Sequence, residues 1–222
     1  MKRIILVVFV LLTQLNYSQT IINLGDFDKI KVFDQLNVTL IPSTENKIEV
    51  TGTNQANVEI VNRNSLLKIR ISLTKILEDN KDLKVNLYFK NIQSIDANEG
   101  SMVSCKTVFK QTTMELSVQE GAMIEAEIDV DNATAKLNSG GIINLSGKAA
   151  TQKSTITSGG ILNAKNLETS QTNVSITAGG SADVNASTFV EAKVNAGGTI
   201  TIFGKPKQIK QQAFAGGTII EK

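Results

Sequence analysis

One segment of this 222-residue chain reads Ile156-Thr157-Ser158-Gly159-Gly160-Ile161-Leu162-Asn163-Ala164. The same pattern occurs seven times, and each copy is anchored by one glycine: Gly100, Gly121, Gly140, Gly159, Gly179, Gly197 and Gly216. Successive anchors are separated by 21, 19, 19, 20, 18 and 19 residues. A period this short and this regular is typical of a solenoid, in which each repeat stacks on the next.

Apolar residues stand at fixed distances from these anchors. Three residues before them are Ala97, Val118, Leu137, Ile156, Ile176, Val194 and Ala213. Three residues after them are Val103, Ile124, Ile143, Leu162, Ala182, Ile200 and Ile219. Five residues after them are Cys105, Ala126, Leu145, Ala164, Val184 and Ile202, with Glu221 as the exception. The intervening fourth position is polar in the first six copies, and this alternation indicates strands with one buried side.

The pattern therefore predicts an all-β fold, a right-handed parallel β-helix (β-solenoid) with coils of about 19 residues. Each coil is expected to contain two strands joined by a tight glycine turn. The position after the anchor is always small, namely Ser101, Ala122, Gly141, Gly160, Gly180, Gly198 and Gly217. We expect this corner to be crowded by neighbouring coils, where close backbone approach excludes larger side chains.

The chain divides into three parts. Residues 1–18 combine two cations, Lys2 and Arg3, with an apolar run and a polar end, which predicts a secretory signal peptide and an exported mature protein. Residues 20–91 alternate less regularly and form either early, irregular coils, which we favour, or a cap over the solenoid. Residues 92–222 form the regular glycine-anchored solenoid.

Composition excludes several function classes. The chain has 23 Lys+Arg and 21 Asp+Glu, and removing the two signal-peptide cations leaves 21 against 21. This balance gives no reason to expect nucleic acid as a partner. Histidine is absent, which excludes histidine bases and histidine metal ligands. Cys105 is the only cysteine and lies in an inward column, so we interpret it as a core residue.

Two groups of polar residues are candidate sites. Glu120, Glu125, Glu127, Asp129 and Asp131 include four acids on one side of a strand. They are either an ordinary solvated strand face, a calcium site or an acid–base pair for glycoside cleavage, and the first interpretation is the simplest. A second candidate is a Thr/Asn-rich binding face formed by Asn144, Asn163, Asp183 and Thr201.

The chain resembles the secreted bacterial family described as "putative auto-transporter adhesin, head GIN domain". The resemblance rests on the segments 27–32, 38–40, 48–50 and 92–95 and on the glycine-anchored copies, and it implies one such domain over about residues 26–207. It also implies a β-solenoid of the cell envelope or a secreted protein, found in Bacteroidetes-type bacteria, with no established catalytic residues. The name-giving Gly-Ile-Asn does not occur.

We therefore expect a non-catalytic binding module without cofactors, located in the periplasm, on the outer surface or outside the cell. Its partner would be a polysaccharide or an envelope protein, and we expect no membrane-spanning segment in the mature chain. The alternatives are a carbohydrate-active enzyme, which would need its acids in a groove beside a cation, and a structural envelope protein. The segment 217–222 predicts an exposed edge strand, through which copies of the chain would associate.

Overall fold

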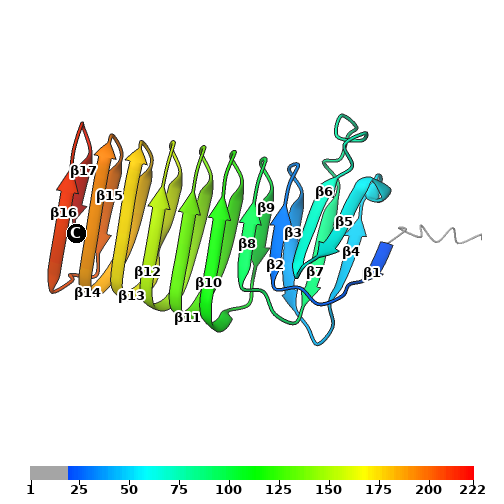
Figure 1. Cartoon of the computed structure of the whole chain (residues 1–222), viewed down its shortest axis with the longest axis horizontal. Helices are drawn as coiled ribbons and strands as arrows, with labels where there is room; N and C mark the ends of the chain where they lie inside the picture. The colour runs from blue at the N-terminus through cyan, green and yellow to red at the C-terminus, as the bar shows by residue number, and fades with distance from the viewer. Residues whose placement is uncertain (1–19) are drawn as a thin grey trace, which may run out of the picture.

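A computed structural model describes residues 20–222, so the predicted signal peptide lies outside the described residues. Within this range the chain forms a single sheet of 17 strands and one short 3-10 helix. No helix of residues 20–222 is long and apolar enough to cross a membrane. The strands stack into an elongated β-solenoid, which confirms the predicted fold class (Figure 1).

The regular half contains strands that pair in parallel with their equivalents in the next coil. Met123 lies beside Ile142, and Ile142 lies beside Ile161. These strands are β8 (Ser94–Ala97), β9 (Met102–Cys105), β10 (Phe109–Val118), β11 (Met123–Leu137), β12 (Ile142–Ile156), β13 (Ile161–Ala178), β14 (Ser181–Ala196), β15 (Thr199–Phe203), β16 (Gln208–Ala213) and β17 (Thr218–Glu221).

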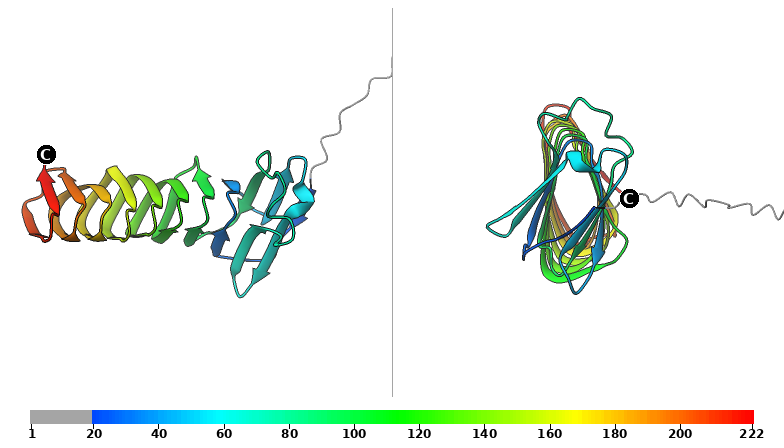
Figure 2. Two further views of the ribbon diagram at one scale, coloured as in Figure 1. Left: turned by 90° about the horizontal axis from the view of Figure 1, so that it is seen from above. Right: turned by 90° about the vertical axis from the view of Figure 1, so that its right-hand side faces the viewer.

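Each coil is flattened, with two faces joined by two corners (Figure 2). Face A consists of β9, β15, β17 and the first part of β10–β14, and face B consists of β8, β16 and the second part of β10–β14. The long strands bend between the faces where two successive residues are exposed, as at Asp131 and Asn132 in β11. This pair interrupts the inward–outward alternation, so the strand changes face while the next inward residue, Ala133, still reaches the core.

The three predicted apolar columns form the core. In the first six copies, each column residue is between 0 and 6% exposed. In the last described coil, Ala213 is exposed and Ile219 is only partly buried, because no further described strand covers that coil. Stacking like residues on like is therefore the main source of burial along the solenoid.

The glycine corner is shaped by two different constraints. The anchor glycines all have positive φ, as Gly140 does at 74°, and a Cβ at Gly140 would meet nothing within 4 Å. The next position has the opposite problem, because a Cβ on Gly141 would lie 2.7 Å from Val118 Cγ2 in the preceding coil. The first glycine thus provides a left-handed backbone, and the second allows close packing.

Residues 20–91 contain both coils and a cap. Their elements are β1 (Thr20–Asn23), β2 (Lys29–Val32), β3 (Asn37–Pro42), β4 (Lys47–Thr51), η1 (Gln55–Asn57), β5 (Val58–Arg63), β6 (Leu66–Ile71) and β7 (Lys84–Phe89). The β2–β3 coil lies between the β6–β7 coil and the β8–β9 coil, all in parallel register. Antiparallel strands then cover the end of the stack: β4 pairs with β7, β1 with β4, and β5 with β6.

Candidate functional site

A polar stripe runs along face A and continues onto β3, β7 and β4, with one outward side chain per strand. Register places each member beside the next through nine strands. In spatial order the polar stripe consists of Glu49, Asn86, Thr39, Ser104, Glu125, Asn144, Asn163, Asp183 and Thr201. The four residues predicted as a binding face are thus consecutive members of a longer stripe, whose next neighbour, Ile220, is apolar.

Within the predicted binding face, exposure to a ligand differs from residue to residue. Asn163 is exposed, and Asn144 and Asp183 are half-buried, whereas Thr201 is only 9% exposed. Asn163 Nδ2 donates a hydrogen bond to Asn144 Oδ1 at 2.7 Å, which orients the two amides along the solenoid axis. Within this amide pair, the Asn144 Nδ2 group and the Asn163 Oδ1 atom do not bond each other and can bond other groups.

A groove of about 680 Å³ lies beside these amides on face A. Its polar lining comes from two outward rows of four successive coils: Ser104, Glu125, Asn144 and Asn163 in one row, and Lys106, Glu127, Ser146 and Asn166 in the other. The inward residues Cys105, Ala126 and Leu145 lie between the rows and form the floor. The groove therefore follows the solenoid axis across several coils.

The ends of this groove coincide with the two coils that exceed 19 residues. Lys106 lies in a bend of the 21-residue copy. The 20-residue copy carries one extra residue between Asn163 and Asn166, opposite Asn144 and Ser146 of the preceding coil, so that Ser146 pairs with Asn166. Insertions in a repeat form bulges on one face of a solenoid. The anchor spacings that exceed 19 residues were therefore the sequence signal that could have located the groove.

An apolar row borders the polar stripe on the side of the glycine turns. Met102, Met123, Ile142 and Ile161 lie side by side in register and are all half-buried. Asn144 Nδ2 lies 3.8 Å from Met123 Sδ, so the row and the stripe are in contact. Outward positions of these coils on face B are polar, for example Thr134, Lys153 and Asn173.

The acidic strand predicted as a calcium or catalytic candidate does not form one cluster. Glu125 and Glu127 line the groove, whereas Asp129 lies in register between Lys110 and Lys148, and Asp131 lies at the corner. Across residues 20–222, no three Asp, Glu, Cys or His side chains are placed to hold a metal ion. The structure therefore gives no geometric support for calcium at this strand.

Glu120 belongs to a different place, the ridge of glycine turns. There the neighbouring carboxylate of Asp34 raises the pKa of Glu99 through a shared hydrogen bond, and burial, the charge of Asp34 and the charge of Glu120 raise it further. The carboxylates of Glu120 and Asp34 thus both repel that of Glu99, and Asp34 is the stronger partner.

Cys105 is buried, and its thiol hydrogen bonds to the carbonyl oxygen of Thr107 at 3.2 Å. Burial raises the pKa of this thiol, so the reactive thiolate is disfavoured.

Sequence reasoning missed a buried polar network inside the coils. Gln152 Nε2 donates to Ser154 Oγ at 3.1 Å, and the hydroxyls of Thr169 and Thr172 lie 2.8 Å apart. Thr172 also donates to Gln152 Oε1 at 3.3 Å, so the network links two coils. Its members satisfy one another, which is the arrangement expected of a structural network.

Comparison with solved structures finds the same fold in other bacterial proteins. A protein of Bacteroides fragilis described as a putative adhesin has a TM-score of 0.86 at 17% identity, covering 92% of this chain and 96% of that one. One of Parabacteroides distasonis, also described as a putative adhesin, has a TM-score of 0.74 at 20% identity, with 92% and 96% covered. Another from Parabacteroides distasonis, described as a putative lipid binding protein, has a TM-score of 0.70 at 17% identity, with 92% and 96% covered.

At these identities the similarity shows the fold alone. Comparison with curated proteins gives no match. Residues 26–206 match one protein family along their whole length. They include most of the described solenoid and its cap. The chain belongs to the family described as "Putative auto-transporter adhesin, head GIN domain".

Proposed function

We propose that the protein is an exported, non-catalytic binding module that holds a neutral polysaccharide in the groove of face A. The observation that carries the proposal is the groove itself, whose amide, hydroxyl and carboxylate groups come from four successive coils. The family description as an adhesin supports a binding role. The apolar run of residues 4–12 after Lys2 and Arg3 supports export, because this pattern is typical of a signal peptide.

The chemistry of the lining favours an extended, hydroxyl-rich chain. Strands of a sheet are about 4.8 Å apart, so the groove offers a similar set of donors and acceptors at each coil. Carboxylates and amides pair well with hydroxyl groups. Glu125 and Glu127 outnumber the single cation, Lys106, which disfavours anionic polymers such as nucleic acids. The row from Met102 to Ile161 would contact the apolar side of the same chain.

A second candidate function, glycoside cleavage, is favoured by one observation. Glu125 and Glu127 share the groove with Lys106, which is the arrangement that an enzyme of this fold would need. Both carboxylates are exposed to solvent, however, whereas a general acid at neutral pH requires a dry site that raises its pKa. We therefore place cleavage second.

Binding is tested on residues 20–222 with a glycan array, followed by titration of a polysaccharide that binds, with and without calcium. Asn144→Ala and Asn163→Ala each remove part of the amide pair and should weaken binding at least tenfold, the scale of a buried hydrogen bond in a ligand site. Asn173→Ala is the matched control, because it removes an exposed amide from face B. Equal affinity for all three variants would contradict the assignment of the groove.

The same mixtures are assayed for released sugars. Product formation that Glu125→Gln abolishes would replace the binding proposal with catalysis. Absence of any glycan ligand would favour an envelope protein as the partner instead. Binding that requires calcium would indicate that the acidic strand holds a cation when the ligand is bound.

A further inference from the structure

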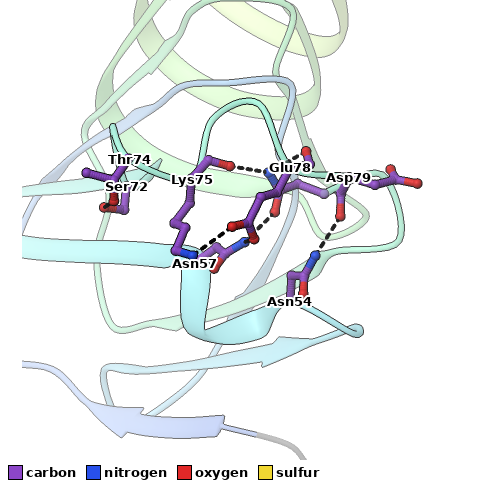
Figure 3. Close-up of polar contacts among 8 residues, drawn as sticks. Asn54, Asn57, Ser72, Thr74, Lys75, Glu78 and Asp79 are labelled. Atoms are coloured by element: carbon purple, nitrogen blue, oxygen red, sulfur yellow. Dashed lines mark hydrogen bonds and ion pairs between the residues drawn. The ribbon is translucent and has the colours of Figure 1, made fainter.

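The loop between β6 and β7, residues 72–83, is braced by polar contacts although it projects from the solenoid (Figures 1 and 3). Asn57 Nδ2 donates to Glu78 Oε2 at 3.0 Å, and Lys75 Nζ pairs with Glu78 Oε1 at 2.7 Å. Asn54 Nδ2 donates to the carbonyl oxygen of Asp79 at 2.8 Å. These contacts, drawn in Figure 3, tie the loop to η1 and to the turn before it. A loop braced in this way keeps a defined shape in solvent.

This braced loop presents an apolar knob, which consists of Leu73, Ile76 and Leu77. Their exposed fractions are 72%, 44% and 98%. Three of the seven exposed large apolar side chains of residues 20–222 thus fall within five positions. Exposed apolar side chains gathered on an ordered element are typical of an interaction surface.

A hollow of about 690 Å³ lies beside the apolar knob and is rich in acids. Its lining includes Asp34, Glu78, Asp79 and Glu99 with only one cation, Lys81, which gives a formal charge of −4 + 1 = −3. Ile76 and Leu77 belong to both the knob and the hollow, so the apolar and acidic surfaces are continuous. This surface is complementary to one that is apolar and basic.

The last described coil carries a surface of that kind. Phe214 and Ile220 are 55% and 40% exposed. Residues 199–222 contain four lysines and one glutamate, a formal charge of 4 − 1 = +3: Lys205, Lys207, Lys210, Lys222 and Glu221. Of these, Lys210 is paired with Glu191 at 2.7 Å. The coil of β16 and β17 and the apolar knob lie at opposite ends of the elongated molecule (Figure 1).

We propose that the apolar knob and acidic hollow of one copy dock on the C-terminal coil of a second copy, so that molecules associate head to tail. The contact uses different surfaces on the two copies, and such heterologous contacts generate open chains of molecules when they do not close into a ring. An acidic hollow disfavours an anionic membrane surface as the occupant. The inference goes beyond ligand binding and does not rest on it.

Direct stacking of the open coil on another coil is a less suitable contact. Gln211 and Glu221 occupy positions that are Ala192 and Ile202 in the preceding coil, where the side chains point inward. Gln211 Nε2 donates to Glu221 Oε1 at 3.3 Å across the interior. An inward charge at a sheet edge opposes pairing with a further strand. The C-terminal coil is therefore better suited to contacts through its exposed side chains than to strand pairing.

Sedimentation velocity tests the proposal with residues 20–222 at concentrations up to about 1 mM, the weak limit of specific association. Wild-type protein should associate reversibly, and added NaCl should weaken the association because the contact is partly ionic. Leu77→Ser and Phe214→Ser should each weaken self-association at least tenfold, as expected for exposed anchors of an interface. Ile21→Ser is the matched control, because Ile21 is an apolar residue outside both surfaces and is 55% exposed, like Phe214.

Mixing the two variants gives the decisive result. Leu77→Ser retains a normal C-terminal coil and Phe214→Ser retains a normal knob, so the mixture should form dimers and nothing larger. Wild-type protein that stays monomeric at low salt would overturn the proposal. So would a mixture that remains monomeric, or variants that associate as strongly as wild type.

Discussion

The clearest test of how the glycine corner is built is a double-mutant cycle on Val118 and Gly141. A Cβ on Gly141 would lie 2.7 Å from Val118 Cγ2 and 2.9 Å from Val118 Cβ and the Val118 carbonyl carbon. One coil earlier, the equivalent residues are Ala97 and Ala122, which are both fully buried. A smaller inward residue therefore accompanies a larger corner residue, and we expect the two positions to be energetically coupled.

The magnitude follows from these contacts. Gly141→Ala overpacks the corner and should reduce the free energy of unfolding by about 2 kcal/mol. Val118→Ala removes two buried methyl groups and leaves a cavity, which should also cost about 2 kcal/mol. In the double variant, the contact with Cγ2 is relieved while those with Cβ and the carbonyl carbon remain. We therefore expect it to lose about 3 kcal/mol, a coupling of about 1 kcal/mol.

The assay is urea unfolding followed by circular dichroism, with calorimetry to check that unfolding is two-state, since long repeat arrays depart from it. The control cycle combines Val118→Ala with Gly217→Ala, whose Cβ would instead meet Val194 Cγ1 at 2.5 Å. This distant pair should be additive. If the Val118 and Gly141 changes also add within about 0.5 kcal/mol, crowding by the preceding coil is the wrong explanation.

Three further predictions concern the turns and the braced loop. Gly140→Ala should cost about 1 kcal/mol because φ is 74° with open space around it, and Gly140→Asn should cost less in the same urea assay. Asp34 first, and burial second, raise the pKa of Glu99 in the folded protein. Ionised Glu99 therefore destabilises the fold as pH rises through that raised pKa. Glu99→Gln should raise Tm at pH 7, and this gain should vanish on acidification. Hydrogen bonds from Thr53 lower the pKa of Asp82, so this brace is present above the unfolded pKa and is lost as pH falls through the folded value. The protection of residues 72–83 against hydrogen exchange, relative to the intrinsic rate at each pH, should therefore fall there, and at neutral pH in Asp82→Asn.

The solenoid was accessible from sequence because its geometry is local and repeated. Each coil stacks on its own equivalent, so a residue's position relative to the anchor glycine determines whether it faces the core. Ile143 and Asn144 illustrate this, since the first is buried and the second lines the outer face as the alternation predicts. The column positions also place Asn144, Asn163, Asp183 and Thr201 in one outward row, and the strand register has them side by side.

The groove and the ends of the solenoid required the tertiary structure. The β2–β3 coil lies beside β8–β9, which follows it by 65 residues, because Lys29 pairs with Ser94. No local pattern specifies that order, since many apolar strands of similar length could fill the same place. The knob depends on Asn57 reaching a loop 21 residues away. The groove depends on irregular coils at its two ends, a bend at Lys106 and a register shift beside Asn166. Sequence by itself determined the repeating unit, because its contacts recur at one spacing. Only the folded chain decided how the unit begins, ends and is interrupted, because those contacts occur once and join distant residues.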